Sequence, residues 1–237
     1  DEAVATARRA REIAQMGLLA FKTLLPAREA AYKANAQELA PDLLREAERY
    51  FADAVKVLEY GDLNEAKQRG ARAEEKYREA ELVAIKAALL GKARQLHEEA
   101  RNQKCDEFAP LTYGEAEAYL LEAEKLLDHD RYAKERATEL ASRAEGAFLH
   151  ALSLRNKIQP AVGKPGLIER QLRNYEAQLA RIAAEFNVQI GPEASPETVA
   201  DQIVTAIRKL KQDDEKLLQS LSERERALAE LRDKIRE

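Results

Sequence analysis

The residues best suited to chemistry in this chain are three histidines and one cysteine: His97, His129, His150 and Cys105. The stretch His97-Glu98-Glu99 resembles the start of the HExxH motif, in which two histidines one helical turn apart bind zinc for peptide hydrolysis. That motif requires a second histidine at position 101, where this chain has Arg101. The sequence therefore predicts no metallopeptidase site at His97.

The other two histidines are also weak candidates. His129 lies between Asp128 and Asp130 in an expected turn, and three adjacent side chains do not easily close around a metal ion. His150 lies among leucines in a helical pattern, where an ordinary, partly buried residue is expected. We therefore predict that the chain binds no metal.

Cys105 lies between Lys104 and Asp106, without a histidine in an arrangement that would activate a thiolate. A single cysteine cannot form an internal disulfide, and this leaves the redox compartment open. The stretch 163–166, GKPG, lacks the strand and helix that a phosphate-binding loop needs on either side. The sequence predicts no enzyme, with no catalytic residue and no cofactor.

Nearly every segment has the 3.6-residue periodicity of a helix, so an all-α fold is expected. Prolines and glycines mark the expected ends, and a break is expected at Pro26, which cannot donate to the preceding turn. Asp62 is expected to cap a long helix, and Ser195-Pro196-Glu197 is typical of a helix start. The expected helices span about 2–38, 41–61, 62–102, 110–129, 130–157, 167–186 and 195–237.

A repeated phrase organises the first two thirds of the chain. Residues 38–54 and 107–123 share eight of seventeen positions, and the match continues downstream with the offset changing from 69 to 71. Internal repeats of this kind indicate stacked structural units. We predict two overlapping three-helix bundles, about 20–86 and 89–157, that share helix 62–102. The predicted domains are 1–157, a linker 158–166 and 167–237, in an elongated molecule.

Small and aromatic residues recur at equivalent places in the two repeats. Alanines one heptad apart allow close helix packing, and aromatic side chains are expected to fill the wider gaps. Gly70 and Gly91, inside helix 62–102, are each expected to be either a close-packing point or a bend. The predicted packing residues are Ala47, Tyr50, Ala54, Tyr77, Ala116, Tyr119, Ala123 and Phe148.

The last helix carries a heptad pattern typical of a coiled coil. Asp214 and Arg224 interrupt the apolar seam. One interpretation is a parallel homodimer; the other is a hairpin with helix 167–186 over their overlap. The seam residues are Ile203, Ile207, Leu210, Leu217, Leu221, Leu228, Leu231 and Ile235. The matching stripe on helix 167–186 is Leu172, Tyr175, Leu179, Ile182 and Phe186.

Composition narrows the class of partner. Charged residues make up 35% of the chain with a net charge of −4, so a basic surface for nucleic acid is not expected. The sequence has no run of about 18 apolar residues, so no membrane span is expected in this chain. The first residues continue a helical phrase without a signal segment, so we expect a piece of a longer precursor.

The repeated pattern resembles the alanine-rich helical domain of bacterial cell-envelope lipoproteins, which often precedes a coiled coil and an OmpA-like peptidoglycan-binding domain. The resemblance covers about residues 20–156. It implies a periplasmic, outer-membrane-associated spacer or docking arm without catalytic residues. Its partners would be proteins or a second copy, and its attachment to cell wall or membrane would lie outside this chain. The matching residues are Ala40-Pro41, Glu46-Ala47-Glu48, Gly61-Asp62-Leu63 and the alanines 66, 73 and 80, with their counterparts Ala109-Pro110, Glu115-Ala116-Glu117, Asp130-Arg131-Tyr132 and the alanines 137, 144 and 151.

A second resemblance gives an alternative function. The phrase 61–66, GDLNEA, followed by alanines at sevenfold spacing is similar to tetratricopeptide repeats, which are adaptors that bind peptides. Their period is about 34 residues, close to half of the offset here, but their helices are much shorter than 62–102. A structural subunit of a phage or secretion system is a third possibility.

Overall fold

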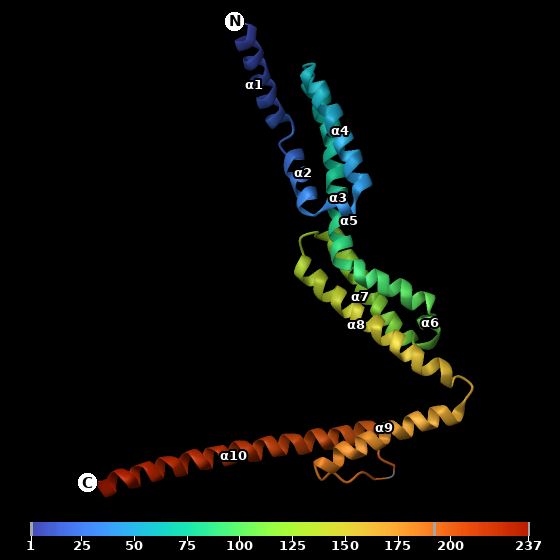
Figure 1. The fold of residues 1–237 in the computed structure, drawn as a ribbon, viewed down its shortest axis with the longest axis vertical. Coiled ribbons are helices and arrows are strands. Elements are labelled where there is room, and N and C mark those ends of the chain that lie inside the picture. The colour runs from blue at the N-terminus through green and yellow to red at the C-terminus, as the bar shows by residue number, and fades with distance from the viewer. Residues whose placement is uncertain (1, 192, 237) are drawn as a thin grey trace. The chain divides into compact units, whose positions relative to one another are not determined.

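The computed structural model describes residues 2–191 and 193–236, with the side chains of 2, 5, 230 and 232–236 left aside. Every regular element in these ranges is helical, so the all-α prediction is confirmed. The chain forms two units, Asp1–Gln159 and Pro160–Glu237, which are described separately (Figure 1). The first unit contains α1 (Glu2–Ala20), α2 (Leu24–Lys33), α3 (Ala36–Leu39), α4 (Pro41–Glu59), α5 (Leu63–Asn102), α6 (Cys105–Phe108), α7 (Pro110–His129) and α8 (Lys134–Ile158). The second contains α9 (Pro165–Glu185) and α10 (Pro196–Arg236), and a 3₁₀ turn, Gln159–Ala161, spans the boundary.

The first unit is built on α5, which runs through both of its bundles (Figure 1). Helices α2 and α4 pack on the first half of α5, and α7 and α8 pack on its second half. Each bundle has its own buried cluster of apolar side chains, and Ala34 packs against both clusters. The predicted pair of three-helix bundles sharing one long helix is confirmed.

The two repeats match in backbone as well as in sequence. Asn35 and Lys104, 69 positions apart, both adopt the left-handed conformation, with φ of 61° and 59°. Ala40 and Ala109 both lie outside the helical region, with φ of −145° and −140°, because the proline that follows disfavours helical geometry in the residue before it. Two four-residue helices, α3 and α6, lie between these points, and the sequence did not predict them.

The helix expected over 2–38 is interrupted earlier than predicted. It breaks at residues 21–23, and Pro26 lies inside the first turn of α2 rather than at the break. A proline is tolerated in a first turn because the N–H groups there have no intrahelical acceptor. The proline therefore follows the start of a new helix. By contrast, Asp62 caps α5 as predicted, its carboxylate accepting from the Glu65 backbone N–H at 3.0 Å.

The two glycines inside α5 have different surroundings. A Cβ added at Gly70 would meet the Phe21 ring at 3.0 Å, so Gly70 is a close-packing point. A Cβ added at Gly91 would meet nothing within 4 Å. The choice left open by the sequence is thus settled for Gly70 as close packing, and Gly91 has no packing role.

Replacing Gly91 with alanine should stabilise the protein by about 0.5–1 kcal/mol, because glycine costs about that much in a helix interior. Gly70→Ala is the matched control, since its gain in helix propensity is opposed by the contact with Phe21. Urea unfolding of both variants measures the difference. Equal stabilisation by the two substitutions would contradict the close packing at Gly70.

The predicted packing residues divide into two groups. Both Tyr50 and Tyr119 are half-buried and pack at the edges of their clusters. The other six have no exposed surface: Ala47, Ala54, Tyr77, Ala116, Ala123 and Phe148. Alanines therefore form the helix contacts, and the rings of Tyr77 and Phe148 fill equivalent places, 71 positions apart, in the two cores.

In the second unit, α9 packs on the first turns of α10. Ser195 caps α10 by accepting from the Thr198 backbone N–H at 3.2 Å. The buried centre of the hairpin is Ala183, Val199 and Ile203, with Leu179 and Phe186 packed around it. The stripe predicted on α9 is therefore only partly used, because a short, alanine-centred contact replaces a long seam. Its other members, Leu172, Tyr175 and Ile182, are exposed.

Candidate interaction sites

His97 lies on α5 in a contact between helices rather than in a catalytic arrangement. Its Nε2 is 3.0 Å from Oε1 of Glu117 on α7. Its ring lies 5.2 Å from that of Phe148 and 5.9 Å from that of Tyr113, measured between centroids. The imidazole thus joins a polar contact at the surface to an aromatic group inside the second bundle.

The first bundle contains the same contact with different residues. Arg28 and Glu48 lie 69 positions before His97 and Glu117. The Arg28 Nε donates to Oε1 of Glu48 at 2.7 Å, and the Tyr32 hydroxyl donates to the same oxygen at 2.9 Å. We name these two contacts, Arg28–Glu48 and His97–Glu117, the repeat clasps. Sequence reasoning missed them, although the Glu residues fall in the repeated phrase.

Charge and burial act together in the first clasp. Burial alone would raise the pKa of Glu48, but the hydrogen bonds from Arg28 and Tyr32, together with the nearby Tyr77 phenol, outweigh it and lower that pKa below its usual value. The hydrogen bond to Glu48 raises the pKa of Arg28. Burial raises the pKa of Tyr77, whose hydroxyl makes no hydrogen bond of good geometry among the described residues. The clasp is therefore an ion pair at neutral pH beside a neutral phenol.

This clasp predicts an acid-sensitive stability. The depressed pKa of Glu48 means that its contribution is fully present above the pKa of the unfolded chain and is lost as pH falls through the folded value. Glu48→Gln should therefore flatten the loss of unfolding free energy between about pH 5 and pH 3. Urea titrations across that range test it, with Glu75→Gln on the exposed face of α5 as control. If the free energy of unfolding falls with pH as steeply in Glu48→Gln as in the Glu75→Gln control, the clasp is contradicted.

The remaining histidines do not form a metal site in the described part of the chain. His129 is exposed at the end of α7. His150 is exposed on α8, not partly buried as predicted, because the periodicity there turns it away from the core side occupied by Phe148 and Leu152. No group of three His, Cys, Asp or Glu side chains within residues 2–191 and 193–236 could hold a metal ion.

Cys105 is fully buried in the second core, and burial raises the pKa of its thiol. Its counterpart in the first repeat is Ala36, which is also fully buried. We expect Cys105 to react with a thiol reagent at least about a hundredfold more slowly in the native protein than in urea. Cys105→Ala should keep the native helical content by circular dichroism. Rapid native labelling would contradict the burial.

A third polar cluster joins the second bundle to the middle of α5. Glu81 is the one charged side chain buried among the described residues, with 3% of its surface exposed. Arg131 Nη1 donates to Oε2 of Glu81 at 2.9 Å and to the Arg78 carbonyl at 2.8 Å, and the Tyr132 hydroxyl donates to Oε1 of Glu81 at 3.0 Å. We name Glu81, Arg131 and Tyr132 the junction cluster. No motif or repeated residue in the sequence predicted this cluster.

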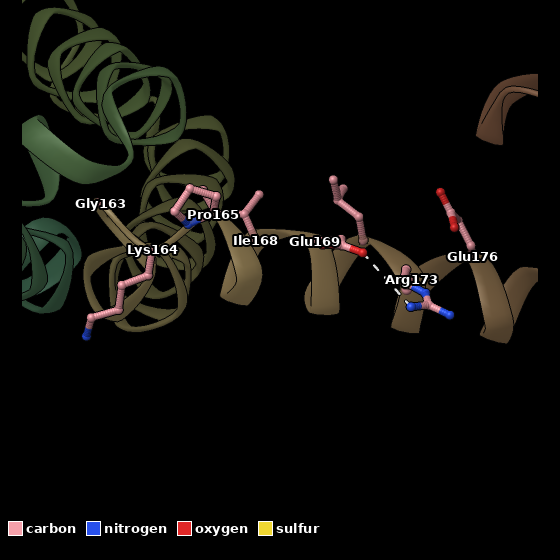
Figure 2. A pocket seen from close by; sticks show the side chains of 8 residues that line it. Gly163, Lys164, Pro165, Ile168, Glu169, Arg173 and Glu176 are labelled. Carbon is pink, nitrogen blue, oxygen red and sulfur yellow. Dashed lines mark ion pairs between the residues drawn. The ribbon is translucent and has the colours of Figure 1, made fainter.

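The GKPG stretch leads into α9, with Lys164 before the helix and Pro165 at its first position. Figure 2 shows the hollow that begins there and runs along the face of α9. Its lining residues are exposed, and the ion pair drawn in it joins Glu169 and Arg173 at 3.9 Å. The hollow is a surface depression along one helix, without a buried polar group that would select a ligand.

The predicted coiled-coil seam is covered only at its start. Ile203 is buried and Ile207 is half-buried against α9. The side chain of Ile235 lies outside the described residues. The next five seam residues are 54–66% exposed: Leu210, Leu217, Leu221, Leu228 and Leu231. We name this stripe, which the hairpin leaves uncovered, the open seam.

No helix in the described ranges is long and apolar enough to cross a membrane. In comparisons with known proteins, no family model matches the chain, and neither the curated proteins nor the solved structures include a significant match.

Proposed function

We propose that this chain is a non-enzymatic spacer or docking arm of a bacterial cell-envelope protein. The observation that carries the proposal is the continuity of α5, whose 40 residues form part of both bundles. At 1.5 Å per residue such a helix is about 60 Å long. A helix supported along its length by two successive bundles is suited to holding its ends apart.

The packing of the first unit supports a mechanical role. Alanines without exposed surface line the contacts between helices in both cores, which permits close approach of the helix axes. Ion pairs reinforce these contacts from outside, for example Lys86 with Asp128 at 2.6 Å and Lys92 with Glu145 at 2.7 Å. Individually such pairs contribute only tenths of a kcal/mol, but together they hold neighbouring helices in one register.

The cellular setting in this proposal comes from the resemblance to alanine-rich envelope lipoprotein domains. It places the chain in the periplasm, associated with the outer membrane, with attachment through regions outside these residues. The alternative, a tetratricopeptide-like adaptor, uses pairs of short helices. The unbroken length of α5 therefore favours the spacer.

Two measurements test the proposal. Spin labels at positions 64 and 102, in a Cys105→Ala background, should give one narrow distance distribution of at most about 57 Å, set by the helix rise. A broad or bimodal distribution would show that α5 hinges and would refute the spacer.

Separately, fractionation of the native cells should find the protein with the envelope. Recovery in the cytosol would refute the proposed cellular setting but not the proposed mechanical role.

A further inference from the structure

The open seam of α10 contains two charges at positions where a coiled coil places apolar side chains. Asp214 and Arg224 interrupt the leucines at heptad spacing, and each lies five residues from Gln219. Charged residues in a seam are costly unless they face an opposite charge, and they often fix the orientation of the partner. The arrangement of these two charges therefore restricts what can cover the seam.

An antiparallel pairing with a second copy solves both interruptions at once. If the twofold axis passes beside Gln219, residues equally distant from it on the two copies face each other. Asp214 then faces Arg224 of the second copy, and the reciprocal pair forms on the other side of the axis. Two apolar layers of the open seam match in the same register: Leu217 with Leu221, and Leu210 with Leu228.

The residues beside the seam agree with this register. Lys211 directly follows Leu210, and Glu225 directly follows Arg224, so both flank the seam at the same heptad position. They lie eight and six residues from Gln219, on opposite sides of it. In an antiparallel coiled coil, such flanking positions approach their own kind on the partner. Lys211 of one copy therefore comes close to Glu225 of the other, which adds a second complementary pair on each side.

A parallel dimer, one of the two interpretations of the sequence, fits the charges poorly. In register it would place Asp214 against Asp214 and Arg224 against Arg224, which are two like-charge contacts inside an apolar seam. The hairpin with α9 covers Ile203 and Ile207 and leaves the open seam unpaired. The antiparallel second copy satisfies the apolar layers and the charged layers together.

We propose that the open seam of α10 binds a second copy of this chain in antiparallel orientation, with Asp214 of each copy facing Arg224 of the other. This inference uses only α10 and does not depend on the proposed envelope setting.

Charge reversal in the full chain tests the pairing. Sedimentation equilibrium should show a dimer of the 26.6-kDa chain. Asp214→Arg and Arg224→Asp should each raise the dissociation constant by about tenfold or more, and the double variant should restore it to within about threefold. In a parallel dimer each of these positions faces its own copy, so the contact joins like charges before and after the reversal. Dissociation constants unchanged by the reversals would therefore overturn the proposal. A chain that stays monomeric at all concentrations would also overturn it.

Orientation can be measured independently of affinity. Single nitroxide labels at positions 212, 219 and 226, all on the outer face, would be placed one at a time in a Cys105→Ala background. Antiparallel pairing predicts that the two labels are closest when both are at position 219. Two labels at position 212, or two at position 226, would be separated along the helix axis by about 21 Å. Equal distances at the three positions would establish a parallel pair and overturn the proposal.

Discussion

Arg131→Met is expected to lower the free energy of unfolding by about 3 kcal/mol. The substitution leaves the carboxylate of Glu81 buried without its counter-charge, and a broken buried ion pair typically costs 3–5 kcal/mol. We expect the lower end because a quarter of the Arg131 side chain remains exposed to water. The variant also loses the hydrogen bond to the Arg78 carbonyl. Urea unfolding of the variant and the parent protein measures the change.

Two further variants separate the junction cluster from an ordinary surface pair. Arg136→Met removes an exposed guanidinium that pairs with Glu139 at 2.7 Å, so it should cost less than about 1 kcal/mol. The double variant Glu81→Leu/Arg131→Met should recover most of the loss, because apolar replacement of both partners removes the unpaired charge. The second repeat has Leu152, buried, at the position equivalent to Glu81. A loss at Arg131 no larger than at Arg136 would contradict the cluster.

The helix ends that the sequence predicted best are those fixed by one local residue. Three examples are Pro41, Pro110 and Asp62. Each acts on the helical turn that it begins, so the start of the helix can be predicted without knowing which other helices pack against it. The break near Pro26 was misplaced because a proline has two compatible positions, at a break and just after a helix start. The choice between them depends on how α2 packs against α5.

Contacts across helices were beyond the sequence because their partners are far apart in the chain. Glu48 is 20 positions from Arg28, and Glu81 is 50 positions from Arg131. Abundant charge hides such pairs among many exposed carboxylates. The repeat offered one usable signal, since Glu48 and Glu117 recur at the same offset as the packing alanines. The junction cluster occurs in one place only, so no recurrence of its residues at the repeat offset could indicate it.

The heptad pattern of the last helix illustrates a different limit. It identified a stripe of leucines, most of which α9 leaves exposed. Periodicity alone does not distinguish a partner in the same chain from a second copy. The proposal of a second copy therefore rests on the lengths of α9 and α10 and on the positions of Asp214 and Arg224.

Phe148→Ala should lower the stability of the second bundle by about 3–4 kcal/mol, because it removes a fully buried ring and leaves a cavity. The ring is in contact with His97 and Tyr113, so the second repeat clasp should also loosen. The two apolar cores are separate clusters joined through α5, as in repeat proteins, where each unit mainly stabilises its neighbour through one interface. We therefore expect the damage to stay largely in the second bundle.

Hydrogen exchange of the full chain can resolve this prediction helix by helix. In Phe148→Ala, amides of α7 and α8 should exchange faster by a factor of about a hundred or more, and those of α4 should change by less than about tenfold. Tyr77→Ala, at the equivalent position, should give the reverse pattern. Equal acceleration in both bundles would show that α5 couples them into one cooperative unit. The stiffness of the proposed spacer would then depend on both cores at once, and a single cavity in either bundle would weaken all of α5.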